Sequence, residues 1–170
     1  MNIWELAEND LRAYGERVVV VYEGQEFTNI EMGRTERKLG NVLKDLGVKR
    51  GDRVIIQMPN CPEVSDSFGA VWSIGAVVVP MNYLIGDEES AHIYQDSGAE
   101  TVISSSEFLS KIEACRAKVP AIKNVLLIDK EVPKGYHSFR ELVEGSSDEL
   151  EMVKTDDDEL AALVYTSGTT

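Results

Sequence analysis

Residues of the kinds that build metal sites and disulfide frameworks are few in this chain. The 170 residues include two cysteines, Cys61 and Cys115, and two histidines, His92 and His137. The cysteines lie far apart and form no Cys-x-x-Cys pair, which indicates reduced thiols rather than a disulfide or a metal pair. Neither histidine has a neighbouring cysteine or a ligand spacing, so the sequence predicts no zinc site.

Basic residues and long apolar runs are also scarce. The chain has 17 Lys and Arg against 30 Asp and Glu, a formal net charge of −13. This imbalance argues against nucleic acid or an anionic membrane as the main partner. The longest apolar stretch, residues 70–81, is shorter than the ~18 residues of a membrane span, so no transmembrane segment is predicted. The N-terminus lacks the basic and apolar regions of a secretory signal, and we expect a cytoplasmic protein.

The last six residues form a hydroxyl-rich run around one glycine. Such runs are common in exposed turns and chain ends without a function. This run, however, follows the apolar residues 160–164, which are typical of a buried parallel strand, and ligands of open α/β sheets bind beyond the carboxyl ends of such strands. Converging N–H and O–H donors suit the phosphates of a nucleotide. The candidate phosphate-binding residues are Thr166, Ser167, Gly168, Thr169 and Thr170.

The run differs from the two commonest nucleotide-binding loops. Gly168 stands alone among hydroxyls, whereas a Walker A loop needs a second glycine followed by lysine. No Gly-x-Gly-x-x-Gly follows a predicted strand, which disfavours a dehydrogenase. Because no lysine or arginine follows Tyr165, we expect these 170 residues alone to be inactive and to bind ATP weakly.

Apolar spacing alternates between strand and helix periods along the chain. Residues 18–22 and 27 flank a turn with Gly24 and predict a β-hairpin. Thr28 and Glu31 form a capping box that opens a helix ending at Gly47. Short apolar or β-branched strands are predicted at 54–56, 77–79, 101–103, 125–128 and 160–164.

Helices are predicted between these strands. Capping boxes at residues 60–63 and 104–107 and the acids at 87–89 mark three helix starts, and a short helix is expected near 139–143. Such an alternation implies right-handed crossovers between parallel strands. The predicted fold class is α/β: an open, doubly wound, mainly parallel sheet with helices on both faces, plus a small N-terminal β-hairpin.

Three other features receive structural interpretations. The acidic run at 156–159 could hold magnesium, but consecutive acids on a loop are more often a solvated connection, which is the interpretation we adopt. His92 is read as an ordinary helix residue. Phe68 and Trp72 lie on the apolar face of a helix and are read as core residues.

Several ordered stretches carry a family resemblance. Residues 27–54 hold a helix followed by Gly-Asp-Arg-Val, and residues 58–63 (MPNCPE), 75–82 (GAVVVPMN) and 96–99 (DSGA) come after it. Together with the final TSGTT run, they resemble the adenylate-forming superfamily of acyl-CoA synthetases, nonribosomal-peptide adenylation domains and beetle luciferases. In that family the phosphate loop continues with Gly-x-Pro-Lys-Gly.

The resemblance implies an AMP-forming ligase. In the family's reaction a carboxylate attacks the α-phosphorus of Mg-ATP, and coenzyme A then displaces AMP from the acyl-adenylate. It therefore implies ATP, Mg and coenzyme A as cofactors and a fatty or other hydrophobic carboxylic acid as substrate, and it leaves open a homodimer. Matching positions imply that the five residues of the run, 166–170, would wrap the β- and γ-phosphates. No catalytic residue and no metal ligand within this chain is implied.

The resemblance also implies how the chain is organised. Residues 1–170 would form one α/β subdomain, the N-terminal part of the large domain, which stops inside the phosphate loop. The loop lysine and the other catalytic groups would lie beyond Thr170. Two alternatives stay open at this point: a free-standing, non-catalytic α/β binding or assembly module, and a nucleotide-binding domain unrelated to adenylation.

Overall fold

The N-terminal part of the chain is a helix followed by a hairpin. The computed structural model describes residues 3–166, and it begins with α1 (Ile3–Tyr14), none of whose residues is buried. β1 (Val18–Tyr22) and β2 (Gln25–Thr28) then pair antiparallel, as predicted. Glu23 and Gly24 connect them with φ of 49° and 79°. Two positive φ angles are the type I′ geometry, whose twist suits a two-residue hairpin loop.

The capping box at the next helix is confirmed. α2 (Asn29–Asp45) begins where Thr28 Oγ1 accepts a hydrogen bond from the Glu31 amide at 3.3 Å. The Glu31 carboxylate accepts in return from the Thr28 amide at 2.9 Å. Gly47, just past the helix, has a φ of 92°, a conformation that suits glycine at a helix end.

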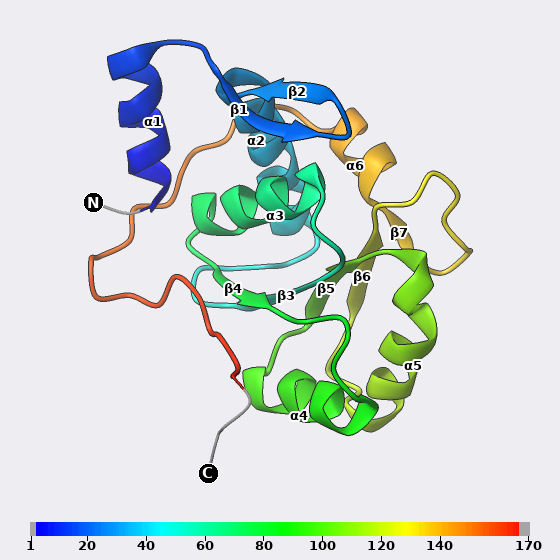
Figure 1. Ribbon diagram of the computed structural model, residues 1–170. Helices are drawn as coiled ribbons and strands as arrows, with labels where there is room; N and C mark the ends of the chain where they lie inside the picture. The colour runs from blue at the N-terminus through cyan, green and yellow to red at the C-terminus, as the bar shows by residue number, and fades with distance from the viewer. Residues whose placement is uncertain (1–2, 167–170) are drawn as a thin grey trace.

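Within residues 3–166, five parallel strands form the main sheet, in the order β4-β3-β5-β6-β7 (Figure 1). Their bounds are β3 (Arg53–Gln57), β4 (Val77–Pro80), β5 (Thr101–Ser104), β6 (Asn124–Leu127) and β7 (His137–Ser138). The helices that follow α2 are α3 (Pro62–Ser73), α4 (Asp87–Ser97), α5 (Leu109–Lys118) and α6 (Phe139–Gly145), with a short 3₁₀ turn, η1 (Ser106–Phe108), before α5.

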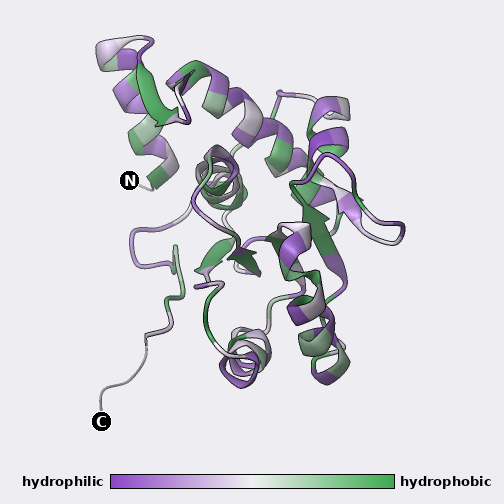
Figure 2. Cartoon of the chain, turned by 45° about the vertical axis from the view of Figure 1, so that its right-hand side comes forward, coloured by the Kyte–Doolittle hydropathy of each residue, from purple (hydrophilic) through white to green (hydrophobic). Residues whose placement is uncertain are grey.

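Helices cover both faces of this sheet. In Figure 1, α2 and α3 lie above the strands, and α4 and α5 lie below them. Figure 2 shows the hydrophobic strands at the centre between these helix layers. The predicted α/β class, doubly wound and mainly parallel, is therefore confirmed, together with the small hairpin. Among the described residues, no helix is both long enough and apolar enough to cross a membrane.

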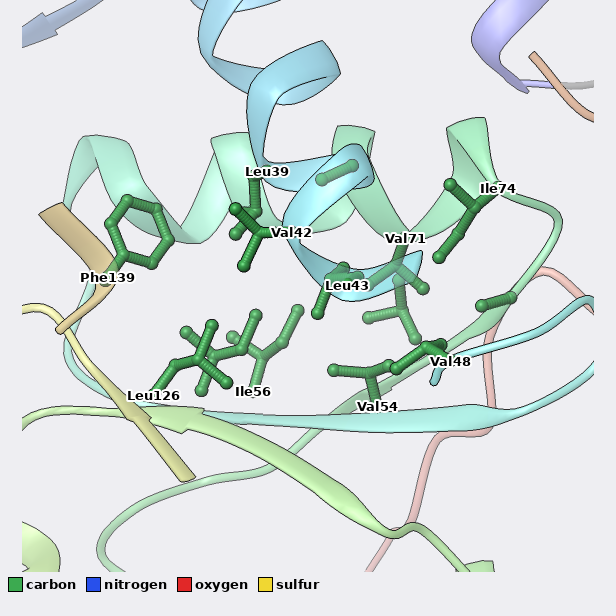
Figure 3. Close-up of a cluster of buried hydrophobic side chains, with 14 of the residues drawn as sticks. Leu39, Val42, Leu43, Val48, Val54, Ile56, Val71, Ile74, Leu126 and Phe139 are labelled. Atoms are coloured by element: carbon green, nitrogen blue, oxygen red, sulfur yellow. The ribbon is translucent and has the colours of Figure 1, made fainter. Parts of the chain in front are cut away.

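Alternating strand residues supply the two cores. Successive side chains of a strand point to opposite faces of the sheet. Val54 and Ile56 of β3 accordingly join the cluster under α2 and α3, whereas Ile55 joins the cluster over α4 and α5. Figure 3 shows the first cluster, in which Leu39 and Leu43 of α2 face these strand residues.

Two of the predicted caps are wrong. α3 begins at Pro62 with Cys61 as N-cap and no side-chain capping bond, so Asn60 lies one residue too early to cap it. Ser104 belongs to β5, and its hydroxyl donates to the Gln57 carbonyl instead. The turn that follows is held by Asp129, whose carboxylate accepts from the Ser106 amide at 2.6 Å. A carboxylate from a distant loop has replaced the local cap.

The strand predicted at residues 160–164 is also wrong. This segment makes one isolated parallel bridge to β4, between Val78 and Ala162, and Leu160 and Val164 are 69% and 63% exposed. Pro80 gives the reason, because the next bond of a parallel ladder would need its amide, and proline has no N–H. The fifth strand of the sheet is instead β7, two residues that no sequence pattern indicated.

Candidate functional site

The segment that leads to the hydroxyl-rich run lies along the outer side of β4. The Val78 amide donates to the Ala161 carbonyl at 3.1 Å, and the Leu163 amide donates to the Val78 carbonyl at 2.8 Å. The indole of Trp72, on α3, donates to the same Ala161 carbonyl at 2.8 Å. Because the segment runs parallel to β4, its residues 165 and 166 come to the carboxyl end of that strand. Trp72 is half-buried, as a core residue would be, but it also anchors this segment.

Tyr165 is bound by α4, on the opposite layer from Trp72. Its phenol oxygen lies 2.6 Å from Oδ2 of Asp96, and its ring meets the ring of His92 edge to face with centroids 6.5 Å apart. Burial, then the hydrogen bond to Asp96 and the charge of that carboxylate, raise the pKa of Tyr165 to about 12. The phenol therefore stays protonated at neutral pH and donates to the carboxylate.

A cavity of about 460 Å³ opens beside Tyr165. Pro80 and Met81 line it at the carboxyl end of β4, and Thr166 lines it from the C-terminal segment. Its other lining residues are Asn82, Ile85, Glu88, Glu89, His92, Ile93 and Tyr165. The cavity combines apolar and polar groups at the sheet edge where ligands of open α/β folds bind.

The structure places the predicted site residues only in part. Thr166 is exposed at the cavity, while Ser167, Gly168, Thr169 and Thr170 lie outside the described residues. Whether these five bind phosphate therefore stays a prediction. The carboxylates of Glu88 and Glu89 lie on the α4 side of the cavity, and the residues that line it include no lysine or arginine. A triphosphate would need a cation to accompany it there.

The acidic run at 156–159 is attached to the fold. Glu159 accepts from Nε of Arg50 at 2.8 Å, and it also accepts from the Asp156 amide at 2.6 Å. Arg50 and the hydrogen bonds lower the pKa of Glu159. In the part of the chain that the structure describes, no group of three His, Cys, Asp or Glu side chains is arranged to hold a metal ion.

A comparison with protein families decides what kind of chain this is. A family model described as "AMP-binding enzyme" matches residues 7–170. The chain belongs to the AMP-binding enzyme family. The resemblance predicted from the ordered motifs is thereby confirmed.

Relatives of this AMP-binding chain include ligases for several acids. The crotonobetaine/carnitine–CoA ligase of Salmonella paratyphi A is 27% identical over 180 residues, which cover 99% of this chain and 34% of that protein. A mitochondrial acyl-coenzyme A synthetase of Rattus norvegicus is 33% identical over 141 residues, which cover 82% and 24%. The matches thus span 34% and 24% of the length of these curated relatives.

A solved structure shows the same architecture. The anthranilate CoA ligase AuaEII, in complex with anthranoyl-AMP, superposes with a TM-score of 0.95 at 28% identity. The match covers all of this chain and 33% of that protein. The fold of the AMP-binding chain is therefore that of a part of a larger ligase.

Sequence reasoning missed two residues beside the cavity. Asp96 was read as part of a structural stretch, and His92 as an ordinary helix residue, although both contact Tyr165. The available signal was their spacing of four on one predicted helix, which puts both side chains on one face. Nothing in the sequence indicated that this face would meet residue 165.

Proposed function

We propose that this chain is an N-terminal portion of an AMP-forming acid–CoA ligase, and that residues 1–170 form one α/β subdomain of its large domain. The observation that carries the proposal is the family match over residues 7–170. Two CoA ligases among the relatives, aligned with nearly all of this chain, support it.

The proposed reaction has two displacements. A carboxylate oxygen of the acid forms a bond to the α-phosphorus of ATP, the bond between that phosphorus and the bridging oxygen breaks, and pyrophosphate leaves. The sulfur of coenzyme A then bonds to the acyl carbon, AMP leaves with its oxygen, and the thiol proton is released. A protein contributes to such steps mainly by positioning the reactants and neutralising charge.

We assign the phosphate contacts to the hydroxyl-rich run. Thr166 would present its hydroxyl and amide at the cavity, and Ser167, Gly168, Thr169 and Thr170 would continue around the β- and γ-phosphates. Mg²⁺ would neutralise the phosphates, and because magnesium uses few protein ligands besides phosphate oxygens, the lack of a ligand cluster among residues 3–166 fits ligands supplied elsewhere in the enzyme.

The substrate we propose is a fatty or other hydrophobic carboxylic acid. A fatty acyl CoA synthetase structure from Mycobacterium tuberculosis, at 25% identity and a TM-score of 0.82, supports it. The ligases named for anthranilate and for carnitine represent the competing aromatic and polar classes.

Acid-dependent exchange of labelled pyrophosphate into ATP tests both parts of the proposal. The full-length protein is assayed with short, long-chain and aromatic acids and with carnitine. We expect exchange, strongest with hydrophobic acids. No exchange with any acid would refute the ligase function, whereas a preference for carnitine or for an aromatic acid would refute the proposed substrate and leave the ligase function intact.

A further inference from the structure

The backbone ladder that holds the C-terminal segment ends before the hydroxyl-rich run begins. Its last hydrogen bond is that of the Leu163 amide with the Val78 carbonyl, and Pro80 cannot extend the ladder. Val164 is 63% exposed. Beyond Leu163, the hydrogen bond that holds the described chain is the one between Tyr165 and Asp96, at 2.6 Å.

Asp96 lies in the last turn of α4, where a carboxylate does not stabilise the helix. It is the penultimate residue of α4, whose last turn contains no basic residue. The carbonyl end of a helix carries partial negative charge, so a carboxylate there is unfavourable by itself. Arg53 of β3 donates to the Ser97 and Gly98 carbonyls at this end of the helix, and the hydrogen bond that the structure gives the Asp96 carboxylate is the one with Tyr165.

His92 makes a second contact between α4 and Tyr165. It lies one turn before Asp96 on α4, and its ring meets Tyr165 at 84° between planes. The phenol oxygen and the ring edge are thus both fixed by α4. Since neighbouring Cα atoms lie about 3.8 Å apart, fixing Tyr165 also restricts where Thr166 and its amide can lie.

We infer that Asp96 is a positioning residue for the phosphate-binding run, because it fixes Tyr165 at the point where the chain leaves the sheet and enters the run. The inference rests on the proposed function and adds a residue on α4 to it. Asp96 touches neither substrate nor reacting atoms in this role. It restricts where the hydroxyl and amide of Thr166 can lie, and small errors in such positions are costly to catalysis.

The test compares variants of the full-length enzyme in the pyrophosphate exchange assay. Tyr165→Phe removes the donor and keeps the ring, Asp96→Ala removes the acceptor, and Asp96→Asn keeps an acceptor oxygen. We expect the first two each to raise KM for ATP roughly tenfold, the loss of one charge-assisted hydrogen bond. Asp96→Asn should raise it less, and the double variant Tyr165→Phe with Asp96→Ala should be no worse than either single one.

A matched control is available in Tyr136, a partly buried tyrosine that packs on the cluster over α4 and α5 and does not line the cavity. Tyr136→Phe should leave KM for ATP unchanged. A purely structural role for Asp96 would lower the melting temperature with KM for ATP unaltered, and that result would overturn the inference. If the fold increases in KM for ATP of the two single variants multiplied in the double variant, the inference would be overturned as well. Absence of exchange in the wild-type enzyme would instead refute the proposed function on which it rests.

Discussion

Asp66 of α3 is a buried carboxyl group that lies near the half-buried Glu36 of α2. Asp66 is 8% exposed, and its Oδ1 has no hydrogen-bond partner among the described residues. The Glu36 side chain approaches α3 so closely that a Cβ added at Gly69 would lie 2.2 Å from its carboxyl carbon. Burial, then the charges of Glu36 and Glu63, raise the pKa of Asp66 to about 8. Burial raises the pKa of Glu36 to about 7, against the opposing effect of Arg37.

This pair makes stability fall as the pH rises. The folded pKa of Asp66 lies above its ordinary value of 3.8, so the folded chain binds more protons than the unfolded chain between those two values. Linkage then requires that stability is lost progressively as the pH rises from about 4 to about 8. Below this window the carboxyl group is protonated in both states, so it adds no pH-dependent cost.

Replacing Asp66 with asparagine removes the part of this dependence that Asp66 causes and leaves the part that comes from the burial of Glu36. At ~1.4 kcal/mol for each pKa unit, the cost of Asp66 at pH 7 has an upper bound of about 4 kcal/mol. Glu36 shares the repulsion and the side chains relax, so we expect the free energy of unfolding of Asp66→Asn, relative to wild type, to gain about 2 kcal/mol between pH 5 and pH 8. For a chain of this size the gain corresponds to about 4–8 °C in Tm.

Urea unfolding followed by tryptophan fluorescence, repeated from pH 5 to pH 9, measures this gain. The asparagine amide changes the free energy of unfolding by the same amount at every pH. The test therefore compares how steeply this free energy changes with pH in the variant and in wild type. The exposed Asp45 on α2 provides the control, because Asp45→Asn should follow the wild-type slope. If the free energies of unfolding of Asp66→Asn and wild type differed by the same amount at every pH, the reasoning would be refuted.

Three further substitutions probe local contacts, each measured by urea unfolding. Thr28→Ala removes the hydroxyl that caps α2 and should cost about 1 kcal/mol, whereas Thr28→Ser should cost little. Gly40→Ala places a Cβ 2.6 Å from Leu150 and 2.9 Å from Oγ of Ser73 and should cost about 1–3 kcal/mol; unchanged or increased stability would contradict the clash. Tyr94→Phe removes the 2.6 Å bond to Oε1 of Gln57, whose Nε2 already lacks a partner among the described residues, and should cost about 1–3 kcal/mol; a neutral result would show that water replaces the hydroxyl.

The fold was predictable wherever a local pattern carried its own physical cause. Thr28 and Glu31 cap a helix because they are three residues apart, and Gly47 follows the end of that helix because glycine accepts a φ of 92° at low cost. The prediction failed at Ser104, whose hydroxyl is taken by Gln57 from a neighbouring strand. A partner far away in the sequence leaves no trace in the local pattern.

The candidate site also has one part that the sequence predicted and another that it did not. The run from Thr166 onward stood out by its composition, and the family match agrees with the resemblance drawn from it. Its attachment through Asp96 and Trp72 could not be foreseen, because these side chains are separated from their partners by 69 and 89 residues. Only folding brings them together.

The sequence by itself determined the alternation of strands and helices, the two-faced sheet and the resemblance to the AMP-binding enzymes, because apolar periodicity, caps and short motifs act over a few residues. The tertiary structure alone decided that residues 160–164 make one bridge to β4 rather than a strand, that α4 binds Tyr165, and that the buried Asp66 lies near the half-buried Glu36. These outcomes depend on distances between side chains of different elements, and packing sets those distances.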